Sequence, residues 1–467
     1  MVFSSLPFLF IFISLTCLFY FAFRSLKWRN GVLLFASLVF YSWGEPRLVL
    51  LMALVVLAAW AGGLGIDALK DRPNARRACF IGTVSLITLN LAVFKYLGFL
   101  VSNINGLFGP VLTVPVIELP IGISFYTFQI LSYVIDLYKG NVGVQKSFPR
   151  LLLYVSFFPQ LIAGPIVRYS TVESEIGRRK EDVNEIAWGL RRFITGLAKK
   201  VIISNGAARF AEIVYAGDPE VYGRLMYWLA AIAYSLQLYF DFSGYSDMAI
   251  GLGRIFGFHF LENFDHPYVS CSITEFWRRW HISLSTWFRD YIYIPLGGSR
   301  VSRGRWFFNI MVVWSLTGLW HGASWNFVFW GLYYGLLLAL EKLVTGRLMA
   351  KLPRPISWLI TMFIVILGWT LFDLTDPAAL STALRTMFAG GPFRPMDVLA
   401  ANTGIIEGAF YISLGLIFMF PVGKLFKKIE SSAPGLILAN LWSAALLVLC
   451  CVYMFGSSFN PFIYFRF

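Results

Sequence analysis

Two of the four histidines lie in surroundings that suit acid–base chemistry. His321 belongs to the segment Trp314–Asn326, inside a run from Trp306 to Leu340 that contains no Asp, Glu, Lys or Arg. An ionisable side chain within an apolar membrane segment is costly, and by default it marks a functional site. A neutral imidazole can accept a proton near neutral pH, so His321 is a candidate general base. The alternative is a structural histidine that hydrogen-bonds to neighbouring helices.

The residues around His321 predict how the ring is placed. On a helix, Trp314, Thr317 and His321 share one face, so the threonine hydroxyl could orient the imidazole. Gly318 and Gly322 carry no Cβ and would let another backbone or a ligand approach closely. This face is therefore expected to border a packed interface or a site.

The second histidine, His281, lies in a segment that is rich in aromatic side chains and arginine. On a continuous helix, Trp277, His281 and Ser285 would align at i, i+4 and i+8, with Arg278 beside them. The planar guanidinium group binds phosphate in a bidentate manner, which suits a phosphate-bearing coenzyme. The alternative is that the arginines of this segment only set the membrane topology.

Two carboxylates, Asp241 and Asp247, occur in the apolar segment Tyr239–Asp247. Buried charges are normally paired. We expect these aspartates to form structural ion pairs with the arginines of the His281 segment, and the alternative is a catalytic role.

The composition indicates an integral membrane protein. Of the 467 residues, 58% are hydrophobic and only 14% are charged, and the mean hydropathy is +0.68. Long charge-free runs without period-two alternation favour membrane helices over a β-barrel. The net charge is +14, and the basic residues lie in short loops between the apolar runs, as the positive-inside rule expects. This distribution argues against nucleic-acid binding.

The apolar runs predict a single all-α polytopic domain over residues 1–467, with about 11–12 transmembrane helices and both termini outside. Two apolar segments, Leu151–Val167 and Ile273–Pro295, are interrupted by proline, glycine or charge and are expected to be re-entrant. Irregular backbone at membrane depth is tolerated only where it is buried or lines a wet cavity. The sequence therefore predicts a cavity that opens to the cytoplasm.

The sequence lacks the signature motifs of several enzyme classes. The chain contains no P-loop, dinucleotide-binding, HExxH or GxSxG motif. Four histidines without a carboxylate–histidine cluster argue against a metal centre, and the five cysteines form no CxxC pair.

Six segments lie in order along most of the chain and together form a recognisable pattern: Phe158–Pro165, Asp241–Asp247, Glu275–Trp287, Arg289–Gly298, Leu319–Asn326 and Asn460–Phe467. In these segments the chain resembles the membrane-bound O-acyltransferases, and within that family the resemblance is closest to the bacterial branch that O-acetylates alginate. A related branch D-alanylates teichoic acids.

The resemblance implies a funnel of helices around a thin central region. It implies that the family's histidine is His321 and that the second polar position of the site is His281. The acetyl donor would be acetyl-CoA from the cytoplasm, with no bound cofactor. A subunit in the bacterial inner membrane would pass acetyl outward to periplasmic partner proteins that modify an exopolysaccharide.

These arguments give one candidate site and two candidate functions. His321 would act as general base or carry the acetyl group transiently, and His281 would orient or assist. The rival function is a transporter of the polysaccharide or of an acetyl carrier, although the inverted repeats typical of many transporters are not visible. The site predicted from the sequence comprises the catalytic residues His321 and His281 and the substrate-binding residues Trp277, Arg278, Ser285, Trp320 and Asn326.

Overall fold

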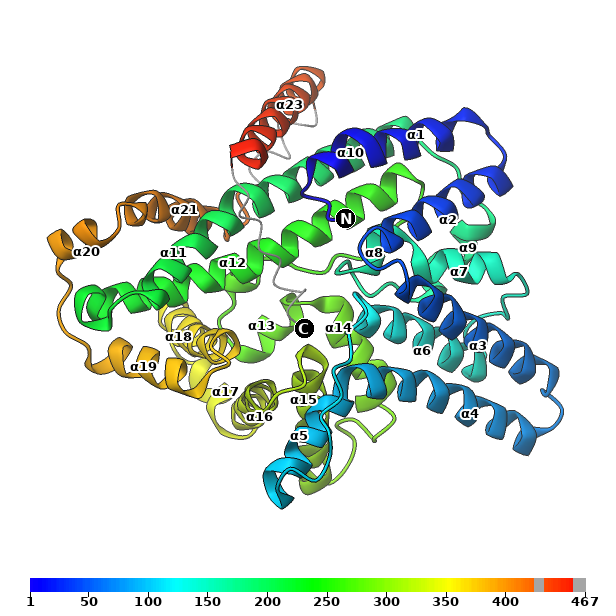
Figure 1. Cartoon of the computed structure of the whole chain (residues 1–467), viewed down its shortest axis with the longest axis horizontal. Coiled ribbons are helices and arrows are strands. Elements are labelled where there is room, and N and C mark those ends of the chain that lie inside the picture. Colours follow the sequence, from blue (N-terminus) through cyan, green and yellow to red (C-terminus); the bar gives the residue numbers. More distant parts are fainter. Residues whose placement is uncertain (424–431, 457–467) are drawn as a thin grey trace. The chain divides into compact units, whose positions relative to one another are not determined.

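The computed structural model describes residues 1–423 and 432–456, so the Asn460–Phe467 segment lies outside the described residues. Helices account for all the regular secondary structure of the described part of the chain (Figure 1). The prediction of an all-α membrane protein is therefore confirmed.

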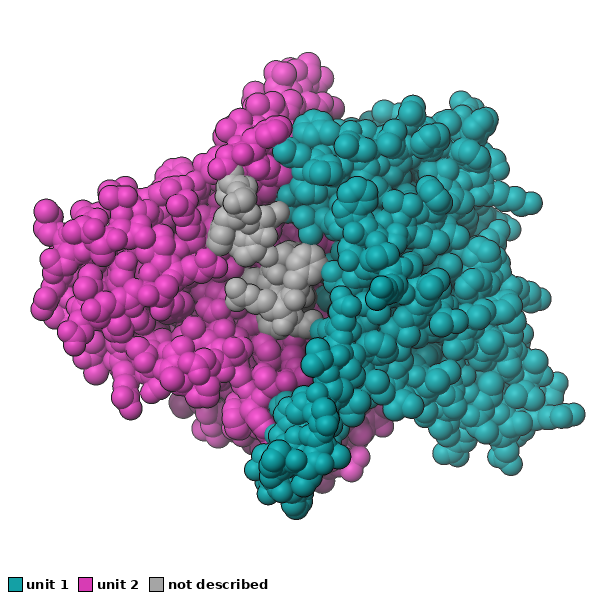
Figure 2. Space-filling view, in the orientation of Figure 1, with its two compact units in different colours: residues 1–193, 248–261 teal, residues 194–247, 262–467 magenta. Residues whose placement is uncertain are grey.

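The described residues form two compact units (Figure 2). The first unit comprises residues 1–193 and 248–261. The chain passes from one unit to the other within α10 (Val183–Ala198), within α12 (Pro219–Ile255, broken at Gly223) and again after Leu261. The other helical elements of the first unit are η1 (Phe8–Phe12), α1 (Ile13–Ala22), α2 (Leu26–Ser42), α3 (Leu48–Ala68), α4 (Pro73–Leu91), η2 (Ala92–Tyr96), α5 (Leu97–Phe108), α6 (Ile123–Lys139), α7 (Phe148–Ser156), α8 (Phe158–Leu161) and α9 (Tyr169–Gly177).

The second unit comprises residues 194–247 and 262–467 and contains the segments of both candidate histidines. Its further elements are η3 (Lys199–Ser204), α11 (Asn205–Ala216), η4 (Pro267–Val269), α13 (Ile273–Arg279), α14 (Ile282–Phe288), η5 (Arg289–Tyr293), α15 (Arg303–His321), α16 (Trp325–Leu340), η6 (Glu341–Thr345), α17 (Gly346–Met349), α18 (Arg354–Asp373), α19 (Pro377–Ala389), α20 (Pro395–Ala401), α21 (Gly404–Phe418) and α23 (Ala433–Gly456).

Five helical stretches among the described residues are long and apolar enough to cross a membrane, and a sixth is added if a pair bent by 106° counts as one span. This number is smaller than the expected 11–12 because several apolar runs are divided into shorter helices. The charge-free run of His321, for example, is split into α15 and α16 at Gly322–Ser324. The six stretches are Leu48–Ala68, Pro73–Phe108, Trp325–Met349, Arg354–Asp373, Ala433–Gly456 and the bent pair Pro395–Ala401 with Gly404–Phe418.

Neither segment that was expected to be re-entrant forms a continuous helix. Leu151–Val167 consists of the end of α7, the single turn of α8 and non-helical chain, and almost all of it is buried. Ile273–Pro295 consists of α13, α14 and η5, with a break at Trp280 and His281. Irregular backbone of this kind requires burial in protein or a cavity, and the second segment does line a pocket, described below.

Helices α15 and α16 pack with their backbones in close contact. A Cβ placed on Gly331 would lie 2.2 Å from the carbonyl oxygen of Trp314, and one on Gly318 would lie 2.1 Å from that of Phe327. A Cβ on Gly322 would lie 2.3 Å from the Phe327 ring. The predicted close approach at Gly318 and Gly322 is therefore confirmed, and it is the small-residue packing typical of membrane helices.

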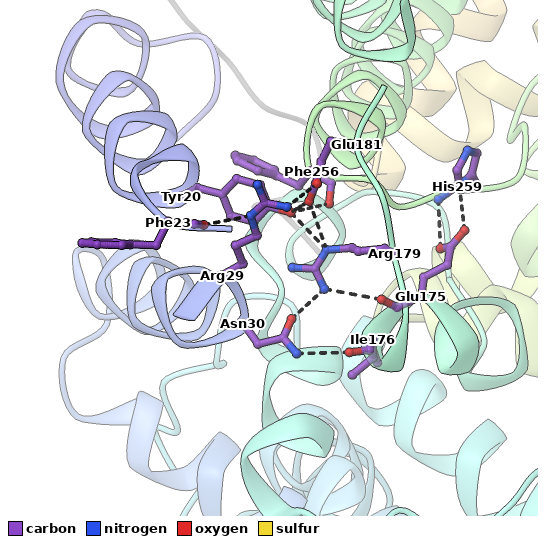
Figure 3. Close-up of polar contacts among 10 residues, drawn as sticks. All are labelled: Tyr20, Phe23, Arg29, Asn30, Glu175, Ile176, Arg179, Glu181, Phe256 and His259. Atoms are coloured by element: carbon purple, nitrogen blue, oxygen red, sulfur yellow. Dashed lines mark hydrogen bonds and ion pairs between the residues drawn. The ribbon is translucent and has the colours of Figure 1, made fainter. Parts of the chain in front are cut away.

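In the first unit, a buried polar network holds the loop between α9 and α10 (Figure 3). The carboxylate of Glu181 pairs with Arg29 and accepts a hydrogen bond from the Tyr20 hydroxyl. Arg179, whose side chain is fully buried, donates to the Asn30 side-chain oxygen over 2.6 Å and to the Tyr20 hydroxyl over 3.1 Å. Each buried charge thus has a partner, as burial requires.

Candidate active site

The N-terminus of α13 is held by side chains from two directions. The hydroxyl of Ser272 accepts a 3.0 Å hydrogen bond from the backbone N–H of Glu275, which is an N-cap interaction. The carboxylate of Glu341 accepts from the backbone N–H groups of Ile273 and Thr274, at 2.7 and 3.2 Å. These contacts satisfy the first N–H groups of the helix. They fix the short helix that carries Trp277 and Arg278.

Helix α13 ends before His281, which has a left-handed backbone conformation with φ 45° and ψ 55°. The expectation that Trp277, His281 and Ser285 lie on one continuous helix is therefore wrong. The break occurs because the backbone of residues 279–282 turns to bond with another segment: Asp265 N–H donates to Arg279 O over 3.0 Å, and Ile282 N–H donates to Asn263 O over 2.9 Å.

The side chain of Asn263 connects the chain segment of residues 263–265 to the His281 ring. Its Oδ1 accepts hydrogen bonds from the backbone N–H and the hydroxyl of Ser283, at 3.1 and 2.8 Å, and lies 3.2 Å from His281 Nδ1. Its Nδ2 donates to Ser246 Oγ over 3.1 Å. Asn263 is completely buried, so this amide is a fixed part of the site.

The imidazole of His281 is surrounded by aromatic rings. Phe242 lies edge-on at 4.5 Å between centroids and Trp320 at 5.8 Å. His281 is 2% exposed, and burial, together with the nearby charge of His321, holds the pKa of its ring well below the ordinary value of 6.5. The Nε2 atom is buried and has no hydrogen-bond partner among the described residues.

His321 is the last residue of α15 and is also buried, at 6% exposure. Its ring contacts Trp320, Trp330 and Phe372 at centroid distances of 4.9 to 5.2 Å. The hydroxyl of Thr317 donates to the carbonyl oxygen of Val313 over 2.8 Å, so its proton is not available to the imidazole. Three aromatic rings thus pack around the His321 ring.

A pocket of about 220 Å³ brings the two histidines together within the second unit. One wall comes from α13, α14 and η5, and the other comes mainly from α15. Trp277 and Trp314, which contact each other at 4.7 Å, both face this space. The lining residues are Thr274, Trp277, Arg278, Trp280, His281, Leu284, Ser285, Phe288, Arg289, Tyr293, Ile310, Val313, Trp314, Thr317, His321 and Leu338.

The other sequence-predicted residues divide into two groups. Trp277, Arg278 and Ser285 line the pocket with the histidines. Trp320 is not among the lining residues, although its ring packs against both imidazoles. Asn326 also lies outside the lining, where its Nδ2 donates to Leu371 O over 2.9 Å and ties α16 to α18.

The two adjacent arginines at the end of α13 have different surroundings. Arg279 donates to the Asp265 carboxylate over 2.9 Å and to Glu275 over 3.0 Å. Arg278 is exposed, lines the pocket, and makes no ion pair with any residue that the structure describes. Its guanidinium group is therefore available to an anion such as a phosphate. Across residues 1–423 and 432–456, no group of three or more His, Cys, Asp or Glu side chains could hold a metal ion.

The two aspartates of α12 pair with lysines, contrary to the expectation that they pair with arginines. Lys200 Nζ lies 2.8 Å from Asp241 Oδ1, and both side chains are almost completely buried. Lys199 Nζ lies 2.6 Å from Asp247 Oδ2. The lysines lie on η3, which belongs to the same unit as the two aspartates. The expected structural role in ion pairing holds, with different partners.

Comparison with known proteins decides the family. The family described as "MBOAT, membrane-bound O-acyltransferase family" matches residues 141–375, which is half of the chain and includes every lining residue of the pocket. This chain is a membrane-bound O-acyltransferase.

Relatives within the family agree with this assignment. The chain is 39% identical to "Probable alginate O-acetylase AlgI" of Pseudomonas aeruginosa, over 93% of this chain and 84% of that protein. It is 35% identical to "Peptidoglycan O-acetyltransferase" of Helicobacter pylori, over 76% of this chain and 72% of that protein. "Teichoic acid D-alanyltransferase" of Bacillus subtilis matches at 31% identity over 47% of this chain and 58% of that protein.

In this membrane-bound O-acyltransferase, Asn263 is a residue in contact with the site that the sequence did not reveal. It precedes His281 by 18 residues, outside any helix that periodicity could have connected to the histidine. No motif rule assigns a role to an asparagine in a loop. Only the fold brings its amide to the ring.

Proposed function

We propose that this membrane O-acyltransferase takes acetyl from acetyl-CoA on the cytoplasmic side of the bacterial inner membrane. The acetyl group passes through the protein and is used for O-acetylation of an exopolysaccharide, alginate in the first instance, with periplasmic partner proteins. The observation that supports this most is the pocket of the second unit, which combines two buried histidines with an arginine that makes no ion pair with the described residues.

In this proposal the pocket residues divide the work of acyl transfer. His321 takes the proton of the acceptor hydroxyl, or carries the acetyl group transiently, and His281 assists. Arg278 binds a phosphate group of the donor or stabilises negative charge on the thioester oxygen. Burial of both imidazoles limits loss of the thioester to water.

The choice of substrates rests on the relatives. An acetyl group is named for the relatives from P. aeruginosa and H. pylori, and alginate is named for the former, which covers 93% of this chain. A pocket of about 220 Å³ walled by Trp277, Trp280 and Trp314 suits a small acyl group.

Transfer can be tested on purified protein with acetyl-CoA labelled in the acetyl group and with alginate as the acceptor, so that a polymer hydroxyl takes the acetyl group as CoA leaves. We expect release of CoA that falls at least 10²-fold in the His321→Ala variant, which is the lower end of what general catalysis by one side chain contributes. His266→Ala is a matched control because His266 is a histidine of the same unit that does not line the pocket. CoA release that survives His321→Ala would refute the assignment, and movement of acetyl-CoA without CoA release would indicate a transporter.

The polymer can be identified in cells that lack the chromosomal copy of this protein. Complementation with the wild-type chain should restore O-acetyl groups on alginate, and the His321→Ala chain, inserted to the same level, should not. Acetylation that is restored on another polymer, with alginate unchanged, would keep the reaction and replace the substrate.

A further inference from the structure

We infer that Asn263 is a positioning residue that fixes the protonation pattern of the His281 ring, with the proton on Nδ1 and a lone pair on Nε2. The inference rests on the proposed function only for its consequence in acyl transfer. The arrangement itself is a property of the resting protein and follows from hydrogen-bond geometry.

The orientation of the Asn263 amide is set by its backbone partner. The backbone N–H of Ser283 is only a donor, and it lies 3.1 Å from the atom assigned as Oδ1. A rotated amide would place its NH₂ group against this N–H, with two donors in contact. On its other side the amide nitrogen donates to Ser246 Oγ over 3.1 Å, and this hydroxyl oxygen can accept. The carbonyl oxygen must therefore face His281.

The position of the ring proton follows from this orientation. Asn263 Oδ1 lies 3.2 Å from His281 Nδ1, and an unprotonated Nδ1 would bring two lone pairs together. The hydroxyl of Ser283 commits its proton to the same Oδ1 over 2.8 Å, so its oxygen can only accept from Nδ1, at 3.4 Å. Both neighbours of Nδ1 are acceptors. Nδ1 must carry the hydrogen, and a neutral imidazole then has a lone pair on Nε2.

This arrangement decides what His281 can do in the pocket. Nε2 is buried and without a hydrogen-bond partner among the described residues, and the pocket is the open space that His281 lines. A lone pair on Nε2 can accept a hydrogen bond or a proton from an O–H or N–H group of a bound molecule that reaches it. It cannot donate to a thioester oxygen, so stabilisation of that oxygen is left to donors such as Arg278 or the indole N–H of Trp277, which has no acceptor in the part of the chain that the structure describes.

The spectroscopic test uses the resting protein with ¹⁵N-labelled histidine. The ¹⁵N chemical shift separates protonated from unprotonated ring nitrogens, and the His281 signals are identified by their loss in the His281→Gln variant. We expect a protonated Nδ1 and an unprotonated Nε2 at neutral pH. A proton on Nε2 in the wild-type protein would overturn the inference, whether or not acetyl-CoA proves to be the donor.

A variant pair separates this effect from general damage to the structure. Asn263→Asp keeps an oxygen that accepts from Ser283 and His281 but adds a negative charge, which favours the protonated ring. We expect the His281 pKa measured by NMR to rise by about 1–3 units, the range for an opposite charge at this separation. Ser246→Ala is the control: it loses the hydrogen bond between Asn263 Nδ2 and Ser246 Oγ, as Asn263→Asp also does, but adds no charge. It should leave the His281 pKa within about half a unit of the wild type.

The third variant, Asn263→Leu, removes the acceptor at nearly constant volume. In Asn263→Leu we expect the ring proton of His281 to move toward Nε2 and CoA release to fall at least tenfold. Asn263→Asp should retain CoA release at pH values above the raised pKa of His281. If Asn263→Leu does not fold, the wild-type and Asn263→Asp spectra decide the question. An unchanged His281 pKa in Asn263→Asp would overturn the inference. Correct spectra without any CoA release in the wild type would instead reject the proposed function.

Discussion

The substitution Gly331→Ala should separate α15 from α16 and thereby damage the pocket. Gly331 contacts the backbone of Trp314, and α15 carries both Trp314 and His321 into the pocket lining. The added methyl group cannot avoid this contact by rotation, because the Cβ position of a helical residue is fixed by the backbone.

The size of the effect can be worked from the contact distances. The new Cβ would lie 2.2 Å from Trp314 O and 3.1 Å from Trp314 C, whereas Cβ atoms essentially never come closer than 3.0 Å to another heavy atom. The helices must therefore move apart by at least 0.8 Å at this point. Overpacking of this kind costs about 1–3 kcal/mol of stability. Displacing a reacting group by about 1 Å can cost about 10²-fold in rate.

Two measurements on purified protein in detergent check this prediction. The midpoint of thermal unfolding should fall, and CoA release from acetyl-CoA should fall by about 10²-fold. Gly304→Ala is a matched control because Gly304 is the second residue of the same helix, α15, and no heavy atom of the described residues lies within 4 Å of its Cβ position. This control should keep its stability within about 1 kcal/mol of the wild type and keep its activity.

The outcome that refutes the reasoning is specific. If Gly331→Ala unfolds at the same temperature as Gly304→Ala and releases CoA within twofold of the wild type, the two helices do not touch through their backbones. If stability falls without loss of activity, the contact exists but does not control the position of His321.

Two further predictions concern buried charges. Lys200→Met should destabilise the second unit by about 3–5 kcal/mol because it leaves the Asp241 carboxylate buried without its cation. The double variant with Lys200→Met and Asp241→Leu should recover most of that loss. Equal midpoints of thermal unfolding for the single and double variants would contradict this. Glu181→Gln should lower the midpoint of thermal unfolding strongly because it removes the charge that faces Arg29. The control Asp67→Asn, at an exposed ion pair, should change stability by no more than about 1 kcal/mol. Similar effects of the two substitutions would show that the Glu181 network is solvated.

The sequence predicted both histidines of the pocket and three of its other lining residues, Trp277, Arg278 and Ser285. His321 stood out because it is ionisable within a charge-free run, and His281 because it lies among tryptophans and arginines. Trp277 and Arg278 were found for the same reason, and all four line one pocket. Membrane sequences allow this because a polar group in an apolar segment requires a reason.

Other features could not be found because they depend on chain segments far apart in sequence. A 3.6-residue period assumes an unbroken helix, and the left-handed backbone at His281 breaks it. The cations of Asp241 and Asp247 are lysines on η3, which no charge count could have chosen over the arginines. Asn263 belongs to a loop without periodicity.

The break at His281 and the amide of Asn263 are best understood as one device. A left-handed conformation costs a non-glycine residue about 1–2 kcal/mol, and such strain persists only where surrounding contacts fix it. Here the backbone N–H groups of Ile282 and Ser283, which begin α14, donate to the carbonyl oxygen and the side-chain oxygen of Asn263. In a continuous helix these N–H groups would bond to residues one turn earlier, and Oδ1 would have no partner to fix its orientation. The hydrogen bonds that stabilise the strained backbone are thus the same ones that present an acceptor to His281 Nδ1.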